Sequence, residues 1–415
     1  MNTGFKLSAI ALALAVSGAA HAATVLTVAS FPSLDEDIKT AIPLYKKVKP
    51  DVEIKLVSLA GNDHHNAMTT ALATGANQPD LMAIEFGFIG KFAESGGLED
   101  LNKPPYNAQQ FKSKFFKFTF AQATGSDGHL AALPVDIGPG TLYYRKDLFD
   151  KAGISEADLT KSWDSYVESG KKLKAATGAY LISSANAVKD IYIRTGLKDG
   201  QGIYFDKDGK TLVESERFVK GFELAKTIRT AGLDGKIGAW SNEWSEGFKQ
   251  NKLATEMMGA WLAGHLGAWI APNTKGLWRS AQLPGNSYAA YGGSFYGIPS
   301  KAPNKAEAWE LLKFLTMNKD QQIAAFEKLD AFPSLIEATT TPFMDQPIPF
   351  LGGQKARQLW KVAAEKIPST DVDKYDPVAA EIVSAELDKV LEQNKDIKQA
   401  LADAKAQIER RVRRK

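Results

Sequence analysis

The sequence of 415 residues contains no cysteine. A chain without cysteine forms no disulfide and offers no thiol for catalysis, metal binding or lipid attachment. Its stability must therefore come from a hydrophobic core, which a chain of this length can build. The same absence predicts that no lipid anchor is attached through cysteine.

The chain also lacks a strong net charge. Lys and Arg number 51 against 48 Asp and Glu, which gives a formal net charge of +3 at pH 7. Nucleic-acid-binding surfaces need a clustered excess of basic residues. The basic ending at residues 410–415 is interpreted as a solvated helix end, so no nucleic-acid partner is expected.

Long apolar runs occur only at the N-terminus. A weakly positive start at residues 1–6 precedes an apolar run at 7–18, and Ala20-His21-Ala22 supplies small residues before a cleavage point. This pattern is typical of a secretory signal peptide and is too short for a membrane span. We expect residues 1–22 to be removed and the product to be a soluble monomer in the periplasm, without direct membrane insertion.

Sequence motifs that carry a catalytic mechanism are missing as well. The chain has no Gly-rich phosphate loop with its lysine, no Gly-x-Ser-x-Gly and no His-Glu-x-x-His. The adjacent His64 and His65 point apart on a helix and have no third ligand nearby in sequence, so neither a metal nor a cofactor is expected. A glycosidase needs only two carboxylates that the fold brings together, and this alternative stays open.

Strand and helix patterns alternate in the first hundred residues. Residues 24–30, 52–59 and 81–84 have the composition of strands, and helix-like patterns lie between them. This alternation predicts an α/β fold with a mostly parallel sheet, whose ligands bind at the carboxyl ends of the strands. The length predicts two large lobes.

Two further segments bear on how the lobes are connected, and a third predicts the structure of the C-terminal part of the chain. Gly138-Pro139-Gly140 suits a chain that crosses between two bodies, and the four prolines within 333–349 predict an extended crossing. Residues 378–412 predict a helical tail that restarts near Asp396, with Gln399 three residues later.

The segment 257–303 threads Trp261, Trp269 and Trp278 and three tyrosines through glycines. Glycine lets the backbone approach a flat group closely, and an aromatic face stacks well on the C–H face of a sugar ring. Packing in the core explains many such rings equally well.

Five stretches of the chain form a recognisable series: 73–82 (ATGANQPDLM) with 91–98 (KFAESGGL), 133–149 (LPVDIGPGTLYYRKDLF), 252–261 (KLATEMMGAW), 292–300 (GGSFYGIPS) and 305–315 (KAEAWELLKFL). In this order they resemble the periplasmic solute-binding proteins of ATP-binding-cassette sugar importers, the family that contains maltose-binding protein. The family more often has Asn where Arg145 stands, which does not affect the pocket.

The resemblance implies a two-lobed fold of the periplasmic binding protein type, with the ligand cleft between the lobes and a hinge of several strands. The first lobe is expected to comprise residues 23–134 and 292–340, and the second residues 135–291 and 341–415. It implies high-affinity binding of a mono- or short oligosaccharide without catalysis. The lobes are expected to close around the sugar and then dock on the membrane permease of the importer.

Candidate ligand-binding residues follow from both lines of reasoning. By resemblance, Trp261 stacks on the sugar. Asp136 follows a strand at the crossover and Glu85 ends the third strand, where their carboxylates would accept hydroxyl groups. The remaining candidates are Asn62, His64, Asn186, Trp240, Asn242, Glu243, Gly293, Ser294 and Trp360. A helix cap, a hinge glycine or a core ring is the ordinary alternative for each of them.

Two other functions are considered. A periplasmic glycosidase would use two of Asp136, Glu85 and Glu243. A receptor for a cationic solute such as a polyamine would use the acids together with the aromatic residues. The abundance of Asn, Ser and Trp near the predicted cleft favours a neutral, hydroxylated ligand.

Overall fold

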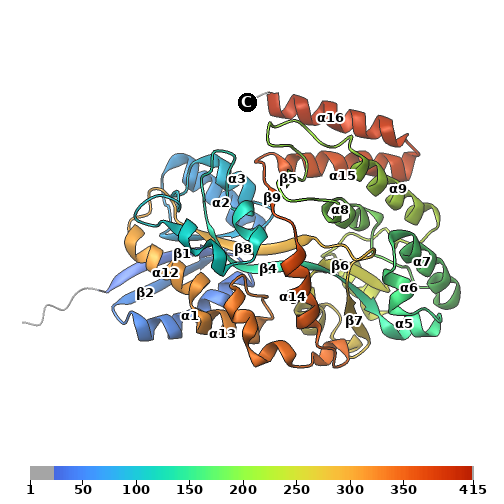
Figure 1. Ribbon diagram of the computed structural model, residues 1–415, viewed down its shortest axis with the longest axis horizontal. Helices are drawn as coiled ribbons and strands as arrows, with labels where there is room; N and C mark the ends of the chain where they lie inside the picture. Colours follow the sequence, from blue (N-terminus) through green and yellow to red (C-terminus); the bar gives the residue numbers. More distant parts are fainter. Residues whose placement is uncertain (1–22, 414–415) are drawn as a thin grey trace, which may run out of the picture.

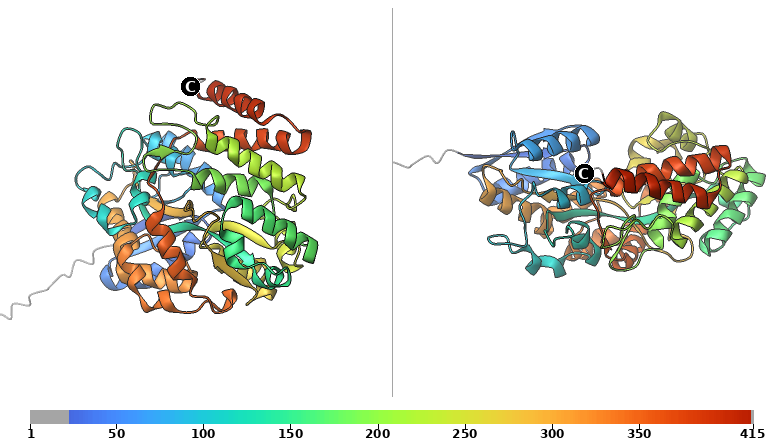
Figure 2. Two further views of the ribbon diagram at one scale, coloured as in Figure 1. Left: turned by 45° about the vertical axis from the view of Figure 1, so that its right-hand side comes forward. Right: turned by 90° about the horizontal axis from the view of Figure 1, so that it is seen from above.

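The computed structural model describes residues 23–413 and shows two α/β lobes side by side (Figure 1). Figure 2 shows the same two lobes from two further directions. The predicted signal peptide, residues 1–22, lies outside the described residues. Within residues 23–413, no helix is both long enough and apolar enough to span a membrane.

The first lobe is built on three parallel strands. Strand β1 (Thr24–Ser30) lies between β2 (Val52–Ser58) and β3 (Leu81–Glu85) and pairs with β2 along its whole length. The connecting helices are α1 (Leu34–Val48) and α2 (Gly61–Thr74), and α3 (Ile89–Ser95) follows β3. The alternation predicted for this part of the chain is confirmed.

The expectation of a mostly parallel sheet is wrong beyond β3. Strand β8 (Ala290–Gly297) pairs antiparallel with both β3 and β4 (Leu133–Arg145), and the sheet order is β2-β1-β3-β8-β4-β6. The segment Gly138-Pro139-Gly140, expected to cross between the two bodies, lies within the continuous strand β4, where glycine permits close pairing with β8. A Cβ atom on Gly138 would lie 2.1 Å from the carbonyl oxygen of Tyr291.

Two strands run between the lobes. The first half of β4 pairs with β8, whereas Gly140–Arg145 pairs with β6 (Thr255–Gly259) and β7 (Trp278–Ala281) in the second lobe. The register between β4 and β8 shifts twice, between Pro134 and Asp136 and between Ile137 and Pro139. These irregularities lie where the two strands cross the middle of the molecule (Figure 1).

The helical tail packs on the outside of the second lobe. Helix α15 (Asp376–Gln393) contacts α9 (Glu216–Thr230), and α16 (Ile397–Arg413) covers both. The break between them is at Asn394, with φ 53°, and Asp396 Oδ1 accepts a hydrogen bond from the Gln399 amide at 2.9 Å. The predicted helical restart is therefore confirmed.

The segment predicted to cross in an extended form is instead three short 3₁₀ turns, Ile336–Thr340, Pro342–Asp345 and Pro349–Leu351. Proline at the first position of a helical turn costs no hydrogen bond, and two of these turns begin with one. The other α-helices and strands are α4 (Lys117–Gln122), α5 (Lys146–Lys151), α6 (Glu156–Thr160), α7 (Trp163–Thr177), α8 (Ala185–Thr195), β5 (Gln201–Gly202), α10 (Asn242–Lys249), α11 (Leu262–His265), α12 (Lys305–Met317), α13 (Lys319–Leu329), α14 (Ala356–Lys366) and β9 (Thr370–Asp371).

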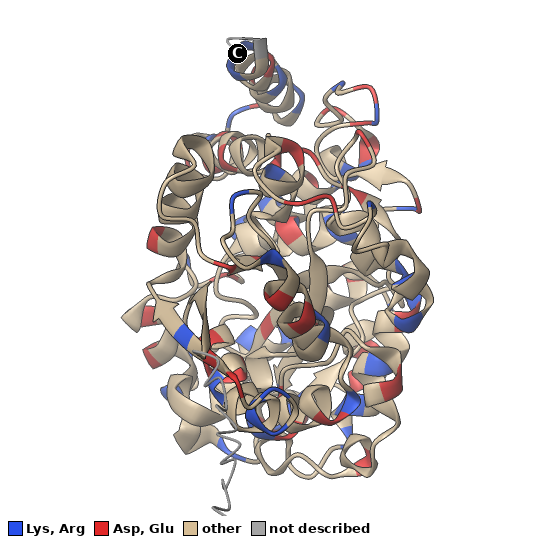
Figure 3. Ribbon diagram, turned by 90° about the vertical axis from the view of Figure 1, so that its left-hand side faces the viewer, with Lys and Arg blue, Asp and Glu red and all other residues tan. Residues whose placement is uncertain are grey.

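Buried apolar side chains form three clusters. One fills the first lobe and one fills the second. The third joins Phe116 and Phe332 to Trp244, Trp278 and Trp360, so it packs segments of both lobes together at their junction. Basic and acidic residues are interspersed over the ribbon (Figure 3), in keeping with the small net charge.

Candidate functional site

Trp261 lies directly after β6, at the start of α11. Its ring is partly buried, and its indole Nε1 donates to the carbonyl oxygen of Tyr291 in β8 at 3.0 Å. Gly259 and Gly292 make this approach possible, because a Cβ atom at either position would lie 2.3 or 2.5 Å from Nε1. One edge of the indole is thus fixed against the crossing strand.

Two rings, those of Trp240 and His265, contact Trp261, and a third, that of Trp269, contacts both of them. The Trp240 ring centroid is 5.7 Å away at an interplanar angle of 23°, and Trp269 is stacked on Trp240 at 6.3 Å and 29°. His265 lies edge-on to all three indoles. Trp240 and Trp269 are 53% and 52% exposed. We call Trp240, Trp261, His265 and Trp269 the aromatic cluster.

Two of the predicted carboxylates meet at Ser294. Glu85 at the end of β3 and Asp136 in β4 are both register partners of Ser294 in β8, so the three residues lie side by side on neighbouring strands. Burial raises the pKa of Asp136 to about 6, although hydrogen bonds from Ser294 oppose the shift. Within the described residues, Asp136 Oδ1 is buried and has no hydrogen-bond partner. This oxygen is therefore a hydrogen-bond acceptor that the described residues leave unused.

Glu85 is held by its own turn. Its Oε2 accepts a hydrogen bond from the Gly87 amide at 3.0 Å. Burial raises the pKa of Glu85, with a smaller contribution from Asp136, while the Gly87 amide and Arg194 oppose the shift. The two carboxyl groups therefore lie near enough to interact electrostatically.

Arg194 at the end of α8 brings the second lobe to these groups. Its guanidinium lies 5.3 Å from the ring centroid of Phe86, which follows Glu85, and 5.7 Å from that of Tyr291. Sequence reasoning missed Arg194 and Tyr291 because no motif marks either of them. It also missed His265, and it noted Trp269 among the glycine-flanked rings without selecting it as a ligand-binding candidate, although their spacing of four and eight residues from Trp261 is a helical signal.

The structure corrects the expectation for His64. Its ring is buried in the first lobe, where Nε2 lies 2.7 Å from the carbonyl oxygen of Ala83, and burial lowers its pKa. Helix α2 lies over β3 and turns this side chain into the core. Asn62, two residues earlier in the same helix and therefore on its opposite face, remains exposed.

Trp360 is corrected as well. Its side chain is fully buried in the third cluster, and its indole Nε1 donates to Ser280 Oγ at 2.9 Å. Gly293 lies in the crossing strand with φ 120°, and its carbonyl oxygen accepts a hydrogen bond from the Phe86 amide at 2.9 Å. This backbone hydrogen bond joins β8 to the residue that follows β3.

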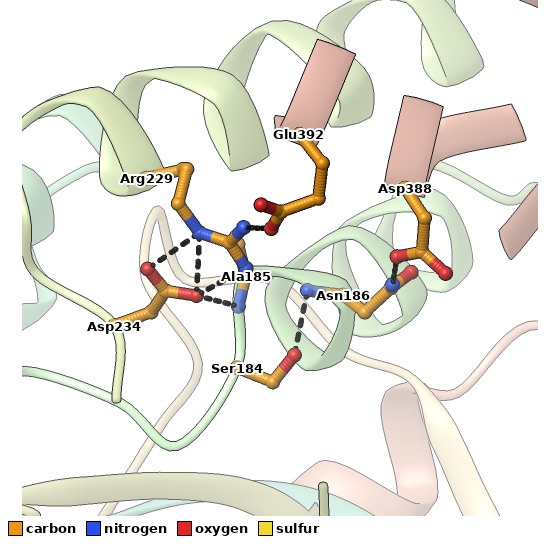
Figure 4. Close-up of polar contacts among 7 residues, drawn as sticks. All are labelled: Ser184, Ala185, Asn186, Arg229, Asp234, Asp388 and Glu392. Carbon is orange, nitrogen blue, oxygen red and sulfur yellow. Dashed lines mark hydrogen bonds and ion pairs between the residues drawn. The ribbon is translucent and has the colours of Figure 1, made fainter. Parts of the chain in front are cut away.

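The side chain of Asn186 points toward Asp388 in the helical tail (Figure 4). Its Nδ2 donates to Asp388 of α15 at 2.8 Å, beside an ion-pair group of Arg229 with Asp234 and Glu392. The expectation that Asn186 binds sugar is corrected, because the contact belongs to the packing of α8 on α15.

Asn242 and Glu243 lie exposed in the first turn of α10, two and three residues after Trp240. Ser241 caps this helix by accepting a hydrogen bond from the Trp244 amide at 3.1 Å. The structure thus places both predicted polar residues next to the aromatic cluster. In the part of the chain that is described, no group of three or more His, Cys, Asp or Glu side chains could hold a metal ion.

Known proteins share this architecture. The profile of the bacterial extracellular solute-binding proteins matches residues 27–322. A lactose-binding protein of Rhizobium radiobacter is 26% identical over 377 residues, 87% of this chain and 86% of the relative. An arabinooligosaccharide-binding protein of Bacillus subtilis is 25% identical over 305 residues, 70% and 69% of the two chains. A solved extracellular solute-binding protein of family 1 superposes with a TM-score of 0.82 at 26% identity, covering 93% of this chain and 99% of its own. The predicted family resemblance and two-lobed α/β fold are confirmed.

Proposed function

The chain belongs to the bacterial extracellular solute-binding proteins, and from this premise we propose that it binds a mono- or short oligosaccharide for an ATP-binding-cassette importer. The curated relatives carry names of sugar-binding proteins. The partners in this proposal are the sugar and the permease subunits of the importer.

The observation that carries the proposal is the pairing of an aromatic face with an unpartnered carboxylate oxygen. Trp261 is fixed against β8 by its hydrogen bond to Tyr291, and Asp136 with its free Oδ1 pairs with the same strand at Ser294. A sugar ring needs both kinds of contact, because its C–H face is apolar and its hydroxyl groups require hydrogen-bond partners.

The mechanism is closure about the crossing strands. We assign residues 23–134 and 292–340 to the first lobe and 135–291 and 341–415 to the second. A ligand that contacts Trp261 in the second lobe and Glu85 in the first, with Asp136 at the start of the crossing, binds the closed form more tightly and shifts the population toward it. The closed form would then be the one recognised by the permease.

The protein is proposed to bind without catalysis. Glu85 and Asp136 flank one residue, Ser294, on adjacent strands of one sheet, and Glu243 lies exposed beside the aromatic cluster. We assign the two buried carboxyl groups to hydrogen bonding with hydroxyl groups.

We further propose that the mature protein begins near Ala23 and is a free periplasmic monomer without a lipid anchor. The mass of the exported protein and its elution in size-exclusion chromatography test this.

A thermal-shift screen tests the function. Mono- and oligosaccharides at 100 times their Kd should stabilise the protein by about 2.7 kcal/mol, because only the folded state binds them. Mass spectrometry after overnight incubation should recover the bound sugar intact. Stabilisation by a polyamine and by no sugar would refute the proposal, and cleavage of the sugar would establish a glycosidase.

A further inference from the structure

Trp240 and Trp269 are the two tryptophans that the described part of the chain leaves more than half exposed. A single exposed apolar side chain needs no explanation, but adjoining exposed rings form a patch. This patch continues directly from Trp261, because the Trp240 ring is stacked on both of its neighbours.

The backbone that presents Trp269 is unusual. Helix α11 is followed by a π-helical turn, Leu266–Ile270, a rare conformation that is frequent at functional sites. The four residues from Trp261 to His265 follow α11 and rotate slightly more than one full turn, whereas the four from His265 to Trp269 follow the π-helical turn and rotate slightly less. The excess and the deficit in rotation cancel, so the three side chains leave the helix on the same face. Ser245 Oγ fixes the end of the turn by donating to the Ile270 carbonyl at 2.6 Å.

The backbone of Trp240 is unusual for a different reason. Its φ is 69°, in the left-handed region that a bulky residue seldom occupies. Such a conformation costs on the order of 1–3 kcal/mol and persists where the surroundings require it. Here it places the Trp240 ring between those of Trp261 and Trp269.

The ring of His265 packs edge-on against the three stacked indoles. The Trp269 indole Nε1 donates to His265 Nδ1 at 3.1 Å, which fixes the plane of the outermost ring. Next to Trp240, the side chains of Asn242 and Glu243 are exposed and make no hydrogen bond or ion pair within residues 23–413. Polar groups for hydroxyls therefore lie beside aromatic faces for sugar rings.

We infer that Trp240 and Trp269 extend the Trp261 site outward, so that the protein takes an oligosaccharide of three or more sugar residues. This inference rests on the proposed function and adds the length of the ligand. The sugar bound at Trp261 lies nearest the crossing strands. The residues that follow it pass over Trp240 and Trp269, with Asn242 and Glu243 beside them.

Calorimetric titration with two homologous series tests the inference: glucose to maltopentaose and arabinose to arabinopentaose. In the better series, the affinity of the wild-type protein should rise at least tenfold between the disaccharide and the trisaccharide or tetrasaccharide. Trp269→Ala should abolish this gain and leave the affinity for the disaccharide within twofold. Trp269→Phe should restore most of the gain.

Trp163→Ala is the matched control, because Trp163 is a partly buried tryptophan of the same lobe that packs on Tyr166 and Tyr192, away from the aromatic cluster. It should leave every affinity unchanged. Equal loss for short and long sugars in Trp269→Ala, or no gain with length in the wild type, would overturn the inference and leave the proposed function standing. Absence of binding to every sugar would overturn both, as would spermidine binding that depends on Trp269.

Discussion

Replacing Trp261 by alanine should weaken sugar binding much more than it weakens the fold. The ring is partly buried, so the face that remains is available to a ligand. If a sugar covers roughly a third of the 150–250 Å² of an indole, the buried area contributes about 1.5 kcal/mol, and the aromatic contact adds about 1 kcal/mol. The total of about 2–3 kcal/mol corresponds to roughly a 30- to 150-fold increase in Kd.

The free protein should lose much less. The substitution removes one hydrogen bond, from Nε1 to the Tyr291 carbonyl, together with part of the packing of a half-buried ring. We expect about 1–2 kcal/mol from these contacts. Trp360→Ala is the matched comparison, because Trp360 is fully buried and should cost about 3–5 kcal/mol.

Titration calorimetry and urea unfolding on both variants decide the matter. For Trp261→Ala we predict a large loss of affinity for the sugar and a small loss in the free energy of unfolding. For Trp360→Ala we predict a large loss in the free energy of unfolding and little change in affinity. Near-normal affinity in Trp261→Ala, with a stability loss equal to that of Trp360→Ala, would refute the stacking role.

Three further predictions concern charge and motion. Asp136→Asn should weaken binding roughly tenfold or more at pH 8, since hydrogen bonds to charged groups are worth about 1.5–3 kcal/mol. Because the carboxylate accepts the hydroxyl and its pKa is raised to about 6, wild-type affinity should fall as the pH drops through 6; calorimetry should find no such fall in the variant. Asp37 accepts hydrogen bonds from Tyr296 and Gln321, and burial raises its pKa to about 7. The folded state therefore binds more protons than the unfolded state between pH 4 and 7. As the pH rises from 4 to 7, the free energy of unfolding of the wild type, measured with urea, should fall by up to about 4 kcal/mol relative to that of Asp37→Asn. A difference between the two proteins that does not change with pH would contradict this. Small-angle scattering should show a smaller radius of gyration at saturating sugar, and an unchanged profile would argue against closure about β4 and β8.

Local patterns in the sequence identified the strands and helices of the first lobe well. The apolar side chains that predict the strand 24–30 also bury most of it, whereas in 52–58 only Val52 is buried because β2 lies at the edge of the sheet. The direction of β8 was not predictable, because an antiparallel partner 200 residues away leaves no local signal. The close pairing of Gly138 with Tyr291, which needs the missing Cβ, was not predictable for the same reason, although the crossing of the chain at 138–140 was expected.

The candidate site was predicted in part. Trp261, Trp240, Glu85, Asp136 and Ser294 occupy two neighbouring groups about β8, in agreement with reasoning from strand ends and glycine-flanked rings. His64 and Trp360 are core residues, because the face of a helix that packs inward depends on its tertiary partners. Arg194 was missed since its importance arises only where Phe86 and Tyr291 approach it from distant parts of the chain.

The central claim is that a sugar is bound intact between Trp261 and the carboxyl groups beside Ser294. A crystal structure of the protein with the best sugar from the thermal-shift screen tests it most directly. We predict a sugar ring on the face of Trp261 and a hydroxyl group within hydrogen-bond distance of Asp136 Oδ1. A sugar bound away from both residues, or a cleaved sugar in the site, would contradict the claim.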